Sequence, residues 1–276
     1  MILRLLKEDI RILMKKKSAW FALLLFLLIA GANIMFIRSE QPIANPYFEP
    51  PSAFEYFVSV QGGGSGFLML FLPLAVTLAT GDMFIRERRS SILSYSVVRA
   101  NTKQYIQSRT VSLGIASFLF TFISQLLLFL GTLIFFPITQ PSTDQGIVYY
   151  AANIFINNPW VYCFIIIVNS ALLAFSFSCL SVIISIIFQN LYVSIMLPYV
   201  VFIGFSEILM SLPMFLGFQG ALFYNLSPLS MAGDYITKSF HWIIVPIYWI
   251  FVGVISVKIA TSLFNNRFEK EKLLLR

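Results

Sequence analysis

Six apolar stretches, each long enough to cross a bilayer, constrain this chain more than any other feature of its sequence. A helix of about 20 consecutive apolar residues spans the hydrocarbon core of a membrane. Of all residues, 58% are hydrophobic and 11% are charged, whereas a typical globular domain has about 25% charged residues. The sequence therefore predicts an all-α integral membrane protein with one transmembrane domain over residues 1–276. Its six transmembrane helices are predicted at residues 19–37, 66–85, 110–136, 160–188, 191–215 and 241–264.

The Lys and Arg residues are divided unevenly between the two sides of these spans. Seventeen of the nineteen lie in the N-terminal segment, in the stretch after the second span, at the inner end of the sixth span or in the C-terminal tail; the other two are Arg38 and Lys238. Because cytoplasmic segments carry an excess of Lys and Arg, both termini are predicted to be cytoplasmic. The net charge of +7 then belongs to one membrane face, which favours membrane lipid as a partner and not nucleic acid.

Residues 2–16 are predicted to form an amphipathic helix. Leu3, Leu6, Ile10 and Leu13 recur at helical spacing, and basic residues occupy the other faces. A basic amphipathic helix lies on the anionic inner leaflet of a membrane. The residues leave two interpretations open: a polybasic anchor, or an elbow helix that contacts a cytosolic partner.

Proline and glycine residues predict how the spans are connected. Residues 38–65 contain four prolines and run into the sequence GGGSG, which predicts a loop with a flexible entry into the second span. Pro73 predicts a kink in that span, and a short loop is expected after the third span. Residues 216–240 are moderately apolar but interrupted by glycines and Pro228, so they are predicted to form short re-entrant or interfacial helices on the external side.

Residue patterns that support catalysis or ion coupling are sparse. The single histidine, His241, and the absence of an HExxH motif predict no metal site, and the serines of spans four and five favour helix packing over nucleophilic attack. The chain is therefore predicted not to be an enzyme. Glu207 is the most interior ionisable residue, and we interpret it as facing a pore or a subunit near the outer interface. An alternative stays open, in which Glu207 serves an ATP-independent secondary carrier or lipid-handling protein.

The stretch at residues 82–109 is the best candidate for contact with a soluble partner. An external motor needs a short, partly apolar protrusion between two spans, and the spans themselves contain no evident source of energy. The alternative is a plain basic juxtamembrane loop. The predicted contact residues are Arg86, Glu87, Arg88, Arg89, Ile92, Leu93, Val97, Val98 and Arg99, and the same stretch also holds the basic residues Lys103 and Arg109.

This arrangement resembles the permease subunit of ABC-2-type ABC exporters, a bacterial family. The likeness covers nearly the whole chain: six spans, an amphipathic N-terminal elbow, a cytoplasmic Glu-Arg loop after span two and a broken external segment before span six. The most specific local match is DMFIRERRSSILSYSVVR at residues 82–99. Such permeases commonly show Glu-Arg, then Gly-Thr, then leucines, then Pro-Val-Ser-Arg; here Ser90 and Ser91 replace Gly-Thr, and residues 96–99 read SVVR.

The resemblance implies a function, partners and site residues. Residues 86–99 would be a coupling helix that docks on a separate ATPase subunit, and the elbow helix would pack beside it. That subunit would bind ATP and Mg, because this chain contains no Walker or Leu-Ser-Gly-Gly motif. No cofactor is expected in this chain itself. Two copies, or this chain and a related one, would enclose a path through the plasma membrane for an amphipathic or lipid-like peptide, drug or lipid. The residues expected along that path are Met69, Leu72, Thr77, Phe205, Glu207 and Met210.

Overall fold

We describe a computed structural model of the chain. The structure describes residues 2–40, 51–62, 68–89, 101–141, 150–188, 190–216, 221–233 and 241–274. Within these ranges the regular structure is helical, with no strand, and six helices are long and apolar enough to cross a membrane. The predicted all-α class is thereby confirmed, and a helix long and apolar enough to cross a membrane lies at each of the six predicted positions.

The long helices match the predicted spans, with differences at their ends. α7 begins at residue 102 instead of 110, and α13 continues to residue 274 instead of ending at 264. A helix can extend past the lipid-facing segment because its backbone hydrogen bonds do not depend on side-chain polarity. The six are α2 (Lys17–Glu40), α4 (Leu68–Thr80) followed by α5 (Met83–Arg89), α7 (Thr102–Phe135), α9 (Pro159–Ile187), α10 (Leu191–Leu216) and α13 (Ile244–Leu274).

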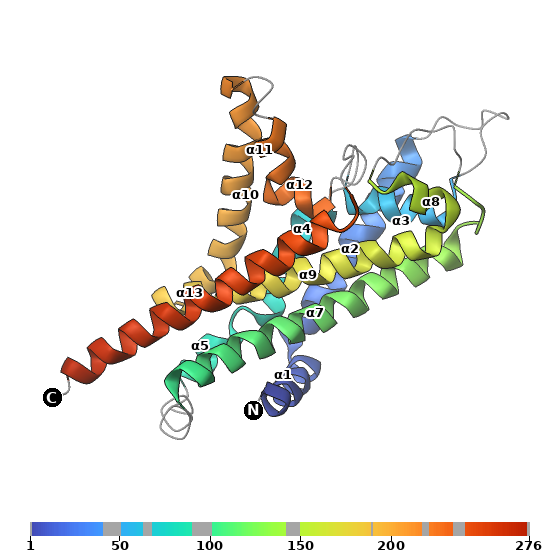
Figure 1. Cartoon of the computed structure of the whole chain (residues 1–276). Coiled ribbons are helices and arrows are strands. Elements are labelled where there is room, and N and C mark those ends of the chain that lie inside the picture. Colours follow the sequence, from blue (N-terminus) through green and yellow to red (C-terminus); the bar gives the residue numbers. More distant parts are fainter. Residues whose placement is uncertain are drawn as a thin grey trace.

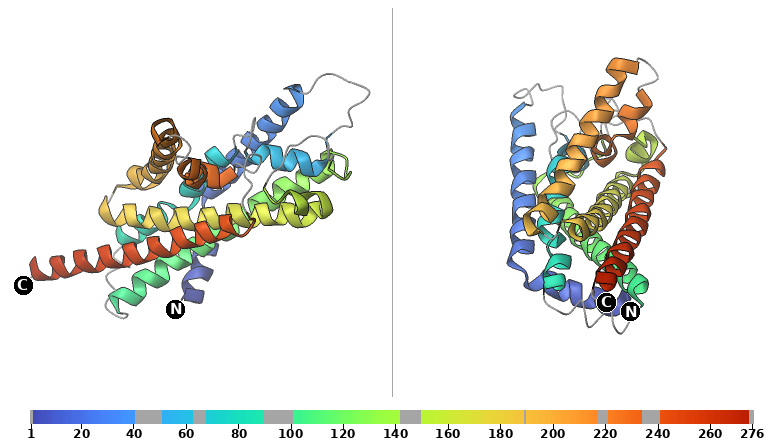
Figure 2. Two further views of the ribbon diagram at one scale, coloured as in Figure 1. Left: turned by 45° about the horizontal axis from the view of Figure 1, so that its top comes forward. Right: turned by 90° about the vertical axis from the view of Figure 1, so that its left-hand side faces the viewer.

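The most central helix is α9, which runs beside α7 and α13 and also contacts α4 and α10 (Figures 1 and 2). Several of its serine hydroxyls donate to carbonyls one turn earlier in the same helix. Ser170 donates to the Ile166 carbonyl at 2.9 Å, and Ser181 donates to the Phe177 carbonyl at 3.1 Å. The hydroxyls of these small residues therefore have hydrogen-bond partners although they are buried. Their small size also allows neighbouring helices to approach closely.

Two glycines bring the neighbours of α9 close to it. Phe175 of α9 lies against Gly114 of α7 and Gly253 of α13, and a Cβ added at either glycine would meet the phenyl ring at 2.6 Å. No side chain fits at that distance, so the ring occupies the space that the two glycines leave. Gly131, also on α7, has no atom within 4 Å of such a Cβ. The requirement for glycine is therefore local to the contact with Phe175.

Residues 38–65 contain a helix where a loop was predicted. α3 (Ala53–Gln61) begins with a capping box: the Glu55 N–H donates to the Ser52 hydroxyl at 3.3 Å, and the Ser52 N–H donates to the Glu55 carboxylate at 2.6 Å. The helix is buried along most of its length, and the amides of Gln61 and Gln125 exchange hydrogen bonds at 2.8 and 2.9 Å. The loop prediction was wrong because the prolines precede α3 and none lies inside it.

The second span breaks at Gly81 and Asp82, between α4 and α5. A Cβ at Gly81 would lie 2.6 Å from the Thr77 carbonyl oxygen, so this turn requires glycine. The Ser194 hydroxyl of α10 donates to the Gly81 carbonyl at 3.0 Å and satisfies a group that the break would otherwise leave free. Pro73, where a kink was predicted, lies inside α4.

Three further short helices lie between the spans. α8 (Ala152–Asn157) falls where the sequence predicted only a loop, whereas α11 (Ala221–Leu226) and α12 (Pro228–Gly233) confirm the prediction of short helices within residues 216–240. α12 is buried against the spans: the Leu229 N–H donates to the Ser206 hydroxyl of α10 at 3.0 Å, and the Trp249 indole of α13 donates to the Met231 carbonyl at 3.3 Å.

One end of the bundle gathers segments that are far apart in the sequence. α1 (Ile2–Lys15) lies across this end, near α5 and the start of α7, and the last turns of α13 reach the same end farther from α1 (Figures 1 and 2). We call this end of the bundle the foot. Arg267 of α13 belongs to it, because its guanidinium donates to the carbonyls of Ile186 and Ile187 at the C-terminus of α9, at 3.2 Å for the latter.

Candidate functional site

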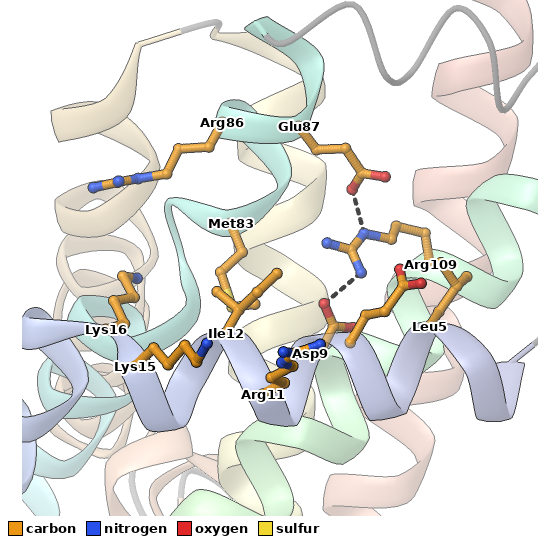
Figure 3. Close-up of a pocket in the computed structure, with 11 residues that line it drawn as sticks. Leu5, Asp9, Arg11, Ile12, Lys15, Lys16, Met83, Arg86, Glu87 and Arg109 are labelled. Carbon is orange, nitrogen blue, oxygen red and sulfur yellow. Dashed lines mark hydrogen bonds and ion pairs between the residues drawn. The ribbon is translucent and has the colours of Figure 1, made fainter.

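The foot buries a network of charged side chains from α1, α5 and α7. Arg109 of α7 lies at its centre and is 4% exposed. Its guanidinium donates to the carboxylate of Asp9 on α1 at 2.5 Å and forms an ion pair with Glu87 on α5. Figure 3 shows the arginine between the two carboxylates. One buried cation thus links the N-terminal helix to the helix that follows the second span.

Hydroxyl groups complete this network. Ser112 of α7 donates to the second carboxylate oxygen of Asp9 at 2.6 Å, and the Tyr105 hydroxyl donates to Glu87 at 2.5 Å. Asp9 is 0% exposed, so its charge depends entirely on these protein partners. Hydrogen bonds and ion pairs are directional, and they therefore specify how α1 and α5 sit relative to α7 more narrowly than apolar contact would.

A second cluster holds the turn between α4 and α5. Asp82 is buried there and pairs with Lys16 and with Arg86, the latter at 2.7 Å. The Lys16 ammonium also donates to the Ala79 carbonyl near the end of α4 at 2.7 Å. Burial lowers the pKa of Lys16, and the neighbouring Asp82 carboxylate opposes that change only in part. Desolvation of the ammonium thus outweighs its attraction to Asp82.

A cavity of about 650 Å³ lies between α1 and α5, beside both clusters. Its apolar wall includes Ile12 of α1 and Met83 of α5, which point toward each other in Figure 3. Its remaining wall is charged. The charged residues that line it are Glu8, Asp9, Arg11, Lys15, Lys16, Arg86, Glu87 and Arg109. A partner that entered this cavity would contact α1 and α5 at the same time.

The structure describes part of the predicted coupling segment. Arg86, Glu87, Arg88 and Arg89 belong to α5, whereas Ile92, Leu93, Val97 and Arg99, with most of the predicted helix at residues 86–99, lie outside the described residues. Arg86 is exposed, and Glu87 turns inward to Arg109 (Figure 3). α5 therefore places a cation at the surface and an anion in the buried network.

Sequence reasoning missed the buried partners of Glu87. We counted Arg109 among the basic residues of the stretch after the second span, but α7 begins at Thr102 and buries it. One sequence signal was available: Asp9 lies on the apolar face of the predicted amphipathic helix, beside Leu6 and Leu13. A carboxylate at such a position requires a buried cation, because an unpaired buried charge is very costly.

The predicted path residues fall into two groups that the structure does not bring together at one surface. Met69, Leu72 and Thr77 of α4 are buried inside the chain, 2%, 2% and 0% exposed. On α10, Phe205 is 51% exposed, Glu207 is also exposed and Met210 is half-buried. The α10 residues are thus available to a path or to lipid, whereas the role predicted for the α4 residues stays a prediction that requires α4 to uncover a buried face.

The chemistry that the foot offers is ionic binding and the positioning of helices. Among the described residues, no three His, Cys, Asp or Glu side chains gather as a metal ion would require. Cys163 and Cys179, which lie too far apart along one helix to form a disulfide, are both free and buried.

No protein-family model matches the chain, and no curated protein matches it at a significant level. The topology of the long helices and the geometry of the foot are therefore the observations that bear on function.

Proposed function

We propose that this chain is the permease subunit of an ATP-driven exporter of the ABC-2 type. It would form half of a translocation path in the plasma membrane for an amphipathic or lipid-like cargo. A second copy, or a related permease chain, would form the other half. Separate ATPase subunits would bind ATP and Mg, and this chain would hydrolyse no ATP itself.

The network of Asp9, Arg109 and Glu87 is the observation that supports this proposal best. An exporter driven from outside the membrane needs its contact helices to move together with its spans. Arg109 sits on the third span and binds one carboxylate from each of the two helices at the foot. A plain basic loop or a lipid anchor needs no such link, because exposed charges avoid the desolvation cost that buried charges carry.

We infer from the distribution of basic residues that the foot faces the cytoplasm. Eight Lys and Arg residues lie on α1, α5 and the turn between α1 and α2, and Arg267 lies on the last turns of α13. The excess of Lys and Arg on cytoplasmic segments supports this orientation. In it, α1 is the elbow helix, residues 86–99 form the coupling helix, and α11 and α12 lie toward the external side.

On this proposal α10 provides the side of the path that the single chain leaves open. α2 and α10 are the least buried of the six spans, and Phe205 and Glu207 lie on the exposed part of α10. A second permease chain that faced α10 would cover these residues. If Glu207 instead drove an ATP-independent carrier, a Glu207→Gln variant would abolish transport measured without any ATPase.

The first test is whether a reading frame adjacent to that of this chain encodes an ABC ATPase. The two proteins are then co-expressed, and co-purification and ATP turnover are measured. In the triple variant Arg88→Ala, Ile92→Ala, Leu93→Ala we expect assembly and stimulated ATP turnover to be lost together. The matched control is Arg38→Ala, Ile138→Ala, Ile156→Ala, which changes three exposed residues of the same kinds at the opposite end of the bundle.

Two outcomes would overturn the proposal at different points. Unchanged assembly and ATP turnover in the triple variant would remove the coupling role of residues 86–99. Transport by the purified chain alone, without an ATPase and without ATP, would remove the exporter assignment itself.

A further inference from the structure

An apolar groove of about 330 Å³ lies where α1 crosses α2 and α7. On α1 it is lined by Leu13 and Met14, which are not among the residues that line the cavity beside α5. Trp20 of α2, with Phe120 and Ile123 of α7, forms the other walls. The groove therefore lies on a different side of α1 from the cavity beside α5.

The polar side-chain groups in the wall of this groove already have partners. The Ser124 hydroxyl donates to the Phe120 carbonyl at 2.8 Å, and the Trp20 indole N–H donates to the Met14 carbonyl at 2.8 Å. The lining is otherwise apolar. Because burial of hydrocarbon is the favourable interaction that such a wall can make, an aliphatic chain suits it better than a polar ligand does.

The position of the groove fits the boundary between lipid headgroups and acyl chains. α2 and α7 are membrane spans, and α1 lies across their ends (Figure 2). Trp20 is 59% exposed at the mouth of the groove, and tryptophan is enriched at this level of membrane proteins. An acyl chain could thus enter the groove without leaving the bilayer.

Two cations of α1 neighbour residues of the groove on the helix surface, and one of them, Arg11, also lines the cavity beside α5. Lys7 precedes the groove residue Ile10 by three positions, and Arg11 precedes Met14 by three, so each pair are neighbours on the helix surface. Both cations are exposed, and neither takes part in an ion pair among the described residues. Their charge complements that of a lipid phosphate at the mouth of the groove.

We propose that this groove is a binding site for an anionic phospholipid of the membrane. One acyl chain lies against Leu13, Trp20 and Ile123, and Lys7 and Arg11 bind the phosphate. The site requires only that α1 rest on a membrane surface, so it is independent of any ATPase partner. A net negative lipid is selected because two uncompensated cations favour it over a zwitterionic lipid of the same chain length.

The charge requirement is tested by native mass spectrometry of the full chain in detergent with equimolar phosphatidylglycerol and phosphatidylcholine. We expect retention of phosphatidylglycerol, and in Lys7→Gln, Arg11→Gln a fall of this preference by about thirtyfold. The control Arg38→Gln, Lys103→Gln removes the same charge from two exposed sites away from the groove. Equal retention of both lipids by the unaltered chain, or an unchanged preference in the first variant, would overturn the proposal.

The groove itself is tested by Ile123→Trp, which fills it from its exposed rim. Displacing as few as two methylene groups lowers lipid retention by about tenfold. The matched control is Ile134→Trp, the same change at a more exposed position of the same helix, for which we expect no effect. If Ile123→Trp keeps its lipid, or instead changes the oligomeric state because a second copy covers the groove, the lipid site is refuted.

Discussion

The foot and the middle of the bundle both join three helices, but they do so with opposite kinds of side chain. In the middle, the ring of Phe175 on α9 fills space left by glycines on α7 and α13. At the foot, Arg109 joins carboxylates on α1 and α5. Close packing gains free energy from every contact, whereas a buried ion pair recovers little more than the cost of removing its charges from water.

Because of this difference, the two regions should contribute differently to the stability and to the geometry of the bundle. The middle should determine how stable the bundle is, and the foot should determine where α1 and α5 sit. A region that positions helices at little net gain in stability is suited to a change of position.

Arg109→Met should destabilise the chain most, by about 3–5 kcal/mol, because it leaves the buried Asp9 and the partly buried Glu87 without their cation. The measurement is the free energy of unfolding in detergent. The triple variant Asp9→Asn, Glu87→Gln, Arg109→Met removes all three charges and should recover most of that loss. If the triple variant is as unstable as Arg109→Met, the charges of the foot contribute net stability, and the foot does not differ from the middle of the bundle in this respect.

Gly114→Leu should lower the free energy of unfolding by up to about 3 kcal/mol, because the new side chain overlaps the ring of Phe175. Gly131→Leu is the matched control on the same helix, where the structure leaves open space. Equal melting temperatures for the two variants would show that the packing of α7 against α9 is looser than described.

Gln125→Leu should cost about 1–2 kcal/mol, because Gln61 then keeps a buried amide without its partner. The double variant Gln61→Leu, Gln125→Leu removes both amides and should restore most of the stability, as measured by thermal unfolding. A double variant that loses the sum of the two single effects would mean that this neutral pair, unlike the charges at the foot, stabilises the bundle directly.

Lys16→Met should have the smallest effect near neutral pH, within about 1 kcal/mol, because Asp82 keeps its ion pair with Arg86. The pKa of Lys16 is lowered in the folded chain from an ordinary 10.5, so between the folded and unfolded pKa values the unfolded chain binds the extra proton. Stability from this group therefore rises with pH in that window and reaches its full value above 10.5.

The pH dependence is checked by unfolding the unaltered chain and Lys16→Met in parallel, near neutral pH and at a pH of about 10, just below the ordinary lysine pKa. The unaltered chain should gain stability relative to the variant as the pH rises. A relative loss of stability would mean that the ion pair with Asp82 outweighs the burial of Lys16.

Hydrophobicity alone located the six spans, because the requirement to face lipid acts on each stretch separately. The same local logic predicted the amphipathic helix at residues 2–16, which the structure has as α1. The short helices α3 and α8 were missed because they are too short to carry a periodic signal and follow segments rich in turn residues. The break at Gly81 was missed because its hydrogen-bond partner, Ser194, lies more than a hundred positions away.

No single stretch of the sequence could predict the buried network at the foot. From the sequence we identified a cluster of charge after the second span, but we did not use Asp9, the lone carboxylate on the apolar face of the first helix. The partner of each became known only once the chain was folded, since Asp9 and Arg109 are separated by 100 positions and meet through the packing of α1 on α7. Burial in lipid is a property of a segment, whereas an ion pair is a property of two segments, and only the folded chain specifies which two.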